Sequence, residues 1–200
     1  TPLDGDIDDW AGALLDVVPH GAVWLGWSLG AMTTLAAATL APERVRALIL
    51  AGGTPRFTRT AGWECGMRPD LLQGFAGELF ASPERTMLRF LGLQVRGADN
   101  ERETLKQLKS AVSQRPQTGV PALRTGLDLL LKTDLRDRLP DLRVPSLWLY
   151  GDRDTLVSSA TAHHVRWLQP EARAQVIAGA GHAPFLSHPA QCLQALEALA

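Results

Sequence analysis

The chain has 200 residues, of which 46% are hydrophobic and 20% charged, and its formal net charge at pH 7 is −1. This composition is typical of one globular domain and excludes a disordered chain, a collagen-like repeat and a coiled coil. The near-neutral charge excludes a general attraction to nucleic acid, and two distant cysteines exclude a disulfide scaffold and favour a reducing compartment, the cytoplasm.

The chain opens with a predicted helix and a long uncharged stretch. Apolar side chains spaced three and four apart from Ile7 to Val18 predict an amphipathic helix, with Asp4 or Asp6 as its N-cap. Residues 17 to 42 contain no Asp, Glu, Lys or Arg, and this stretch is long enough to span a membrane. We expect two buried elements in series instead, and no membrane span, because the stretch is interrupted at Pro19, Gly21, Gly26 and Gly30.

A strand, a helix and a second strand are predicted next. Ala22 to Trp27 and Val45 to Leu50 are largely apolar runs without alternation, which are typical of strands buried on both faces. The stretch from Leu29 to Leu40, rich in alanine and leucine, predicts the helix between them. A helix joining two strands implies that the strands are parallel, since a hairpin needs no helix.

This alternation stops at about residue 56. Residues 56 to 69 are rich in glycine and proline and predict a loop. Residues 70 to 131 then predict four helices, whose apolar positions are Leu71, Leu72, Phe75 and Leu79; Met87, Phe90, Leu91 and Gln94; Leu105, Leu108 and Val112; and Leu123, Leu127, Leu130 and Leu131.

Strands return near Pro145. Residues 146–150 and 174–177 predict strands, and residues 158–168 and 189–199 predict helices. The sequence therefore predicts an α/β core made of residues 1–56 and 131–200, split by a helical cap at residues 57–130.

Gly26 to Gly30 form a Gly-x-Ser-x-Gly motif at the junction of a predicted strand and a predicted helix. That context is typical of a nucleophile elbow, in which a tight turn lifts the serine hydroxyl above the sheet. Glycines two residues either side of Ser28 would let the strand and helix backbones approach each other. The following helix N-terminus would stabilise negative charge beside the serine.

A serine nucleophile needs a base and an acid, and both are predicted after later strands. His182 directly follows the strand at 174–177, in a glycine-containing loop, and is the candidate base. Asp154 follows the strand at 146–150 by four residues and is the favoured acid, with Asp152 as the alternative. The order serine, aspartate, histidine matches that of α/β-hydrolases. We expect structural or surface roles for the remaining histidines, which are His20, His163, His164 and His188.

These three side chains predict acyl transfer. His182 would take the Ser28 proton while the serine oxygen attacks a carbonyl, and the Leu29 N–H would bind the oxyanion. We expect no metal and no cofactor, because the sequence has no HExxH motif, no cysteine–histidine cluster, no P-loop and no GxGxxG after a strand.

Longer stretches around these residues resemble one family of α/β-hydrolases. They lie at residues 23–30, 42–48, 132–136, 149–151 and 181–185 and are similar to the BioH family, the carboxylesterases of biotin synthesis. The resemblance covers nearly the whole chain. It implies a mostly parallel sheet with a helical cap, the triad Ser28, Asp154 and His182, and hydrolysis of the methyl ester of pimeloyl-acyl-carrier protein. The substrate contacts that it implies are Trp27, Leu29, Phe90, Leu91, Gly92, Leu93 and Gln94.

The resemblance also implies contacts of the cap with acyl-carrier protein, at Arg85, Arg89, Arg102 and Lys106. Helical spacing supports a shared face, since Arg85 and Arg89 are four residues apart, as are Arg102 and Lys106. Residues 83 to 115 hold seven basic and four acidic residues, although the whole chain carries −1. A merely solvated helix face is the alternative, because glutamates are interleaved at Glu84, Glu101 and Glu103.

One departure from the family lies at the N-terminus. Members of the family carry further strands before this point, together with a His-Gly loop that supplies the second oxyanion N–H. We therefore expect that the chain lacks the first strands, that its strand at residues 22–27 has an exposed edge, and that its activity is weak. The alternatives are another small α/β-hydrolase, either a short-chain esterase or an enol-lactone hydrolase, and a catalytically weak hydrolase fragment. We expect a monomer.

Overall fold

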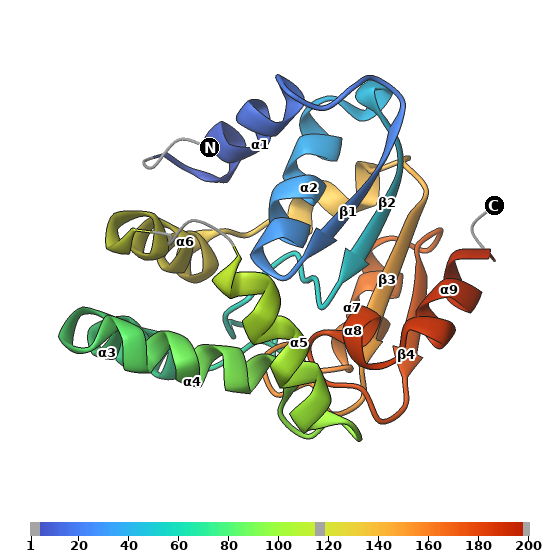
Figure 1. The fold of residues 1–200 in the computed structure, drawn as a ribbon. Helices are drawn as coiled ribbons and strands as arrows, with labels where there is room; N and C mark the ends of the chain where they lie inside the picture. The colour runs from blue at the N-terminus through green and yellow to red at the C-terminus, as the bar shows by residue number, and fades with distance from the viewer. Residues whose placement is uncertain (1–4, 115–118, 198–200) are drawn as a thin grey trace.

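A computed structural model describes residues 5–114 and 119–197 and shows an α/β fold (Figure 1). The sheet and the helices packed on it are α1 (Ile7–Leu15), β1 (Ala22–Trp27), α2 (Leu29–Leu40), η1 (Pro42–Arg44), β2 (Val45–Ala51), η2 (Arg136–Asp141), β3 (Ser146–Gly151), α7 (Thr161–Leu168), β4 (Arg173–Ile177), α8 (Pro184–Ser187) and α9 (Pro189–Glu197). Between β2 and β3 the chain forms the cap helices, which are α3 (Pro69–Ala81), α4 (Pro83–Val95), α5 (Glu101–Ser113) and α6 (Val120–Lys132).

The sheet has the strand order β1-β2-β3-β4, and every neighbouring pair is parallel. Parallel pairing requires a crossover between strands, which α2, the cap helices and α7 provide. β1 lies at one edge and pairs with β2 alone among the described strands, so the expected exposed edge is confirmed. Its side chains Val23 and Leu25 are 49% and 56% exposed.

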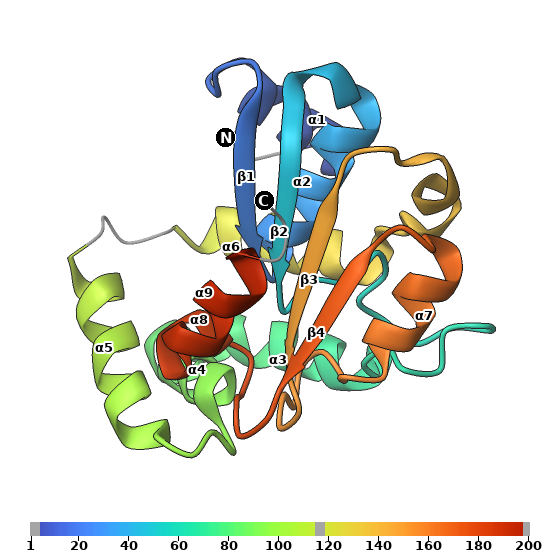
Figure 2. The same cartoon turned by 90° about the vertical axis from the view of Figure 1, so that its right-hand side faces the viewer.

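Helices cover both faces of the sheet, which explains why its central strands are apolar without alternation. Leu48, Leu50 and Trp148 point into the cluster that also contains α1, α2 and α7. Ile49, Leu147 and Leu149 point into the cluster formed with α9. Figure 2 shows α1, α2 and α7 on one side of the sheet and α8 and α9 on the other.

The first helix is shorter than its periodicity predicts, because it ends at Leu15 rather than Val18. The Arg44 side chain from η1 donates to the carbonyls of Leu15 and Val18, at 2.7 and 3.0 Å. These bonds satisfy two carbonyls at the end of the helix that have no partner within it. Asp6 is the N-cap, with a capping box to Asp9. The other predicted cap, Asp4, lies outside the described residues.

All four helices expected between residues 70 and 131 are present as α3 to α6. In Figure 1 they lie beyond the arrowhead ends of the strands. Two later expectations need correction. The helix expected from residue 158 begins at Thr161, after a turn in which the Thr161 N–H donates to Ser158. A short helix, α8, precedes the closing helix, whose expected end at residue 199 lies outside the described residues.

The chain enters and leaves the cap helices side by side. Arg56 forms an antiparallel bridge with Asp134, and their side chains make an ion pair at 3.0 Å. Burial alone raises the pKa of Asp134, but hydrogen bonds from Arg136 and the charges of Arg136 and Arg56 outweigh it, so the pKa lies below its usual value. The carboxylate therefore stays charged and holds the two connections together. The division into a core at 1–56 and 131–200 and a cap at 57–130 stays a prediction.

Candidate active site

Ser28 occupies a backbone conformation that side chains rarely adopt. Its φ is 56° and its ψ −120°, and it is the only non-glycine residue with positive φ in the described part of the chain. It follows β1 and begins α2, and its N–H donates to the Ala51 carbonyl at 3.0 Å. Its hydroxyl makes no capping bond to α2, so the side chain is free to project from the turn.

Only one of the two flanking glycines is required by the close packing of the turn. A Cβ at Gly26 would lie 2.4 Å from Thr34 Oγ1 and 2.6 Å from Ala31 Cα. A Cβ at Gly30 would meet nothing within 4 Å. The expectation that both glycines allow the approach of strand and helix is therefore confirmed for Gly26 and wrong for Gly30, where α2 already turns away from β1.

We expect Gly26→Ala to lower the free energy of unfolding by about 3 kcal/mol or more, because overpacking against backbone forces strand and helix apart. Gly30→Ala should instead be neutral or stabilising by up to about 1 kcal/mol, since alanine favours an exposed helical position. Urea unfolding of the two variants measures both effects. Equal loss of stability in both would contradict the asymmetry.

His182 and Asp154 form a fully buried pair. His182 Nδ1 lies 2.6 Å from Asp154 Oδ2, and both side chains have 0% exposure. The other carboxylate oxygen, Oδ1, accepts the N–H groups of Leu156 and Val157 at 2.8 and 3.0 Å. These bonds orient the carboxylate, which in turn orients the imidazole. His182 Nε2 is buried and has no hydrogen-bond partner among the described residues.

Ser28 and this pair lie at the same end of the sheet, although no hydrogen bond joins Ser28 to His182 Nε2. Ser28 follows β1, Asp154 follows β3 and His182 follows β4, so all three leave the same end of a parallel sheet. The imidazole packs on Gly52 at the end of β2, where a Cβ would lie 2.8 Å from His182 Cε1. Gly52 also has a positive φ of 52°. Its role was missed, although a glycine directly after a buried strand is a signal of close approach.

The structure distinguishes between the two candidate acids. Asp152 Oδ1 accepts the N–H of Gly179 at 2.8 Å, so this carboxylate braces the loop after β4. Asp154, two residues further, is the one that reaches the imidazole. Between them, Arg153 Nη1 donates to Asp99 Oδ1 at 2.5 Å and to the Gly97 carbonyl at 3.1 Å. The loop that carries Asp152 and Asp154 thus also holds the connection between α4 and α5.

The other histidines lie away from this pair. His20 and His163 are exposed. His164 packs edge-on against Trp63 with ring centroids 5.3 Å apart. His188 Nδ1 lies 2.8 Å from Ser187 Oγ at the start of the last helix. Their surroundings agree with the structural or surface roles expected for them.

Cap helix α4 carries the predicted substrate-contact segment and contacts the loop that carries His182. The His182 N–H donates to the carbonyl of Gln94 at 3.0 Å. Leu91 is buried against Val95 and Leu108, and Trp27 packs on this cluster. Phe90 meets Phe75 of α3, with centroids 5.4 Å apart. Two further predicted contacts on α4 are half-buried, Gly92 and Leu93.

The second predicted contact region lies on α2. Leu29, directly after Ser28, is half-buried and faces Gly126 of α6, where a Cβ would lie 3.2 Å from Leu29 Cδ2. Leu29 is also the first residue of α2. Its N–H belongs to the first helical turn, whose N–H groups have no carbonyl partner within the helix. This N–H can therefore bind an anion beside Ser28.

The predicted carrier-protein residues are not part of this buried site. Arg85 and Arg89 are exposed on α4, and Arg102 and Lys106 are exposed on α5. Arg89 pairs with Glu78 of α3. The other three have no ion pair within the described ranges.

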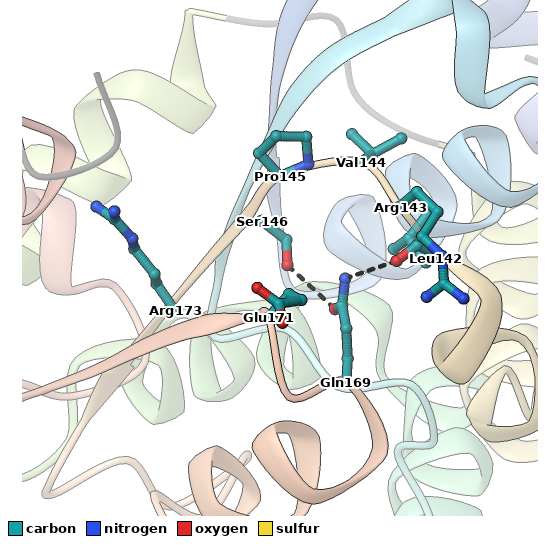
Figure 3. A pocket seen from close by; sticks show the side chains of 8 residues that line it. All are labelled: Leu142, Arg143, Val144, Pro145, Ser146, Gln169, Glu171 and Arg173. Carbon is teal, nitrogen blue, oxygen red and sulfur yellow. Dashed lines mark hydrogen bonds between the residues drawn. The ribbon is translucent and has the colours of Figure 1, made fainter.

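Two pockets lie elsewhere on the molecule. One, of about 350 Å³, lies where β3 and β4 begin, opposite the end that carries Ser28, and includes the Ser146–Gln169–Leu142 hydrogen bonds (Figure 3). The other, of about 450 Å³, lies between α1 and α6 and is lined by residues that include Asp6, Asp128 and Arg138. Neither is lined by Ser28, Asp154 or His182.

Two further buried groups, Tyr150 and Cys192, have pKa values raised by burial. Burial raises the pKa of Tyr150, at the end of β3, well above its usual value, so the phenol stays protonated. Burial also raises the pKa of the Cys192 thiol to about 11. No group of three or more histidine, cysteine, aspartate or glutamate side chains in the described ranges could hold a metal ion. Among the described helices, none is long and apolar enough to cross a membrane.

Both the sequence and the fold of this chain are similar to those of known hydrolases. The alpha/beta hydrolase fold family matches residues 4–189. The pimeloyl-[acyl-carrier protein] methyl ester esterase of Photobacterium profundum is 43% identical over 96% of this chain and 75% of its own length, and that of Citrobacter koseri is 42% identical over the same shares. The chain thus spans about three quarters of these relatives. An esterase structure from Exiguobacterium antarcticum superposes with a TM-score of 0.88 at 21% identity, covering 99% of this chain and 75% of that one.

Proposed function

Since this chain belongs to the alpha/beta hydrolase fold family, we propose that it is a serine carboxylesterase that hydrolyses the methyl ester of pimeloyl-acyl-carrier protein in biotin synthesis. The observation that carries the chemistry is the buried Asp154–His182 pair, at the same end of the parallel sheet as the Ser28 turn. The substrate is proposed from the two curated esterases of that name, which are 42% and 43% identical to this chain.

In the proposed mechanism His182 Nε2 accepts the Ser28 proton as Oγ attacks the ester carbonyl. The oxyanion of the tetrahedral intermediate accepts the Leu29 N–H, where the N-terminal end of the α2 dipole adds stabilisation. His182 then gives its proton to the methoxide oxygen, and methanol leaves. The acyl group is now an ester of Ser28.

The second half repeats these steps with water. His182 takes a proton from water, whose oxygen attacks the acyl-enzyme, and then returns that proton to Ser28 Oγ. The product is a free carboxylate at the end of the carrier-bound chain. The Asp154 carboxylate accepts the Nδ1 proton of His182 in a hydrogen bond and stabilises the imidazolium that forms.

The test is methanol release from pimeloyl-acyl-carrier protein methyl ester, compared with the same methyl ester on a short carrier-free thioester. We expect a higher kcat/KM for the carrier-bound ester. Higher kcat/KM for short free esters would make this chain a short-chain esterase instead, and rapid opening of an enol-lactone would make it a lactone hydrolase.

Carrier protein is proposed to dock on the exposed basic residues of α4 and α5. Arg85, Arg102 and Lys106 are exposed, and carrier proteins are acidic, so the two surfaces would attract each other. Because α4 also carries Gln94, whose carbonyl binds the His182 N–H, a chain leaving a carrier docked there starts close to the proposed site.

We expect Lys106→Glu to raise KM for the carrier-bound ester about three- to tenfold and to leave the carrier-free ester unchanged. The effect should shrink as salt is raised from 50 to 500 mM, because salt screens exposed charges. Arg166→Glu is the matched control, since Arg166 is also exposed but lies on α7. An equal rise in KM for both variants, or for both esters, would rule out this docking surface.

We also propose that the protein works in the cytoplasm as a monomer. Cys65 and Cys192 are both free, which agrees with a reducing compartment. Sedimentation of the purified protein tests the oligomeric state.

A further inference from the structure

The backbone of His182 is held from both sides by distant parts of the chain. Its N–H donates to the Gln94 carbonyl on α4, at 3.0 Å. Its carbonyl accepts the indole Nε1–H of Trp27, at 2.9 Å, across a separation of 155 residues. Together with the Asp154 contact at Nδ1, these bonds give His182 three fixed points from three different elements.

The Trp27 ring is itself held in place by packing. It meets the Phe185 ring of α8 edge-on with centroids 5.4 Å apart, and lies tilted to the His182 ring at 6.0 Å. It also packs against the cluster of Leu91, Val95 and Leu108 from α4 and α5. An aromatic ring enclosed in this way keeps the direction of its N–H.

From these contacts we infer that Trp27 is a positioning residue for the general base, acting through the His182 carbonyl rather than through the substrate. The inference rests on the proposed function. Trp27 is the last residue of β1 and directly precedes Ser28, so one side chain ties the turn of the nucleophile to the loop of the base. The distance between Ser28 Oγ and His182 Nε2 then depends on the indole hydrogen bond.

This role differs from the substrate contact implied by the family resemblance, and the difference is measurable. A substrate contact strengthens with acyl length and appears mainly in KM. A positioning contact changes proton transfer for every ester alike and appears in kcat.

The test compares Trp27→Phe with Trp24→Phe. Both residues lie on β1, but the Trp24 Nε1 is buried and has no hydrogen-bond partner among the described residues. The same chemical change there removes no hydrogen bond. The substrates are pimeloyl-acyl-carrier protein methyl ester and p-nitrophenyl acetate, with the rate of fluorophosphonate labelling of Ser28 and the urea unfolding midpoint measured alongside.

We expect Trp27→Phe to lower kcat about tenfold on both esters, with KM within about twofold, and to slow labelling in proportion. Trp24→Phe should match the unsubstituted protein. If Trp27→Phe unfolds, replacing the Trp27 indole with benzothiophene by nonsense suppression exchanges only the N–H for sulfur and should give the same loss.

Unchanged kcat in either Trp27 variant would overturn the inference, and so would a loss confined to KM of the long-chain ester. Failure of the proposed substrate shows differently. If the unsubstituted protein hydrolyses p-nitrophenyl acetate but not the pimeloyl ester, the substrate proposal fails while the comparison of tryptophans still decides the role of Trp27. If the unsubstituted protein neither hydrolyses either ester nor reacts with the fluorophosphonate at Ser28, both proposals are wrong.

Discussion

Ser28→Ala should lower kcat for ester hydrolysis about a millionfold while the protein stays folded. Removing Oγ removes the atom that forms the acyl-enzyme, so neither His182 nor the helix N-terminus can compensate. The hydroxyl makes no capping hydrogen bond to α2, so its loss should change the free energy of unfolding little. Methanol release under single-turnover conditions measures the residual rate, and a fluorophosphonate probe should no longer label the protein.

Ser28→Gly provides a matched second variant. It is equally inactive but removes the side chain from a position with φ of 56°. Backbone strain of this kind costs about 1–3 kcal/mol, part of which the greater freedom of glycine in the unfolded chain offsets. We expect Ser28→Gly to be about 1 kcal/mol more stable than Ser28→Ala. Equal stability would mean that the turn stores no strain, and hydrolysis by either variant at the rate of the unsubstituted protein would exclude Ser28 as the nucleophile.

Asp154→Asn should give the second largest loss, about ten-thousandfold in kcat. Asp154 Oδ1 accepts two backbone N–H groups, so an amide at this position keeps its oxygen there and turns its NH₂ toward His182 Nδ1. That contact requires Nδ1 to be unprotonated and moves the ring proton to Nε2. The imidazole then has no lone pair for the Ser28 proton.

Asp152→Asn is the control for this substitution. It changes the same residue type two positions away, and its retained Oδ1 can still accept the Gly179 N–H. We expect its kcat to match that of the unsubstituted protein. A large loss in Asp152→Asn with activity retained in Asp154→Asn would assign the acid to Asp152.

Most of the fold was predictable because it is encoded in local patterns. Apolar runs predicted β1 and β2, and apolar residues at helical spacing predicted α3 to α6. The ends of elements were less predictable. α1 ends at Leu15, where Arg44, nearly thirty residues away, binds the carbonyls of Leu15 and Val18, and no pattern within the helix shows that contact.

The sequence alone determined the kind of site: a Gly-x-Ser-x-Gly turn between strand and helix, followed by an aspartate and a histidine after later strands. Each of these signals is contained in a short stretch of sequence, because the turn depends on local sterics and the parallel topology brings the strand ends to one edge of the sheet. Only the tertiary structure showed which side chains and backbone groups contact one another. It distinguished Asp154 from Asp152, made Gly26 but not Gly30 indispensable to the packing, and turned Trp27 toward the His182 carbonyl. Those choices depend on how loops far apart in the chain dock on one another, and sequence spacing contains no measure of that distance.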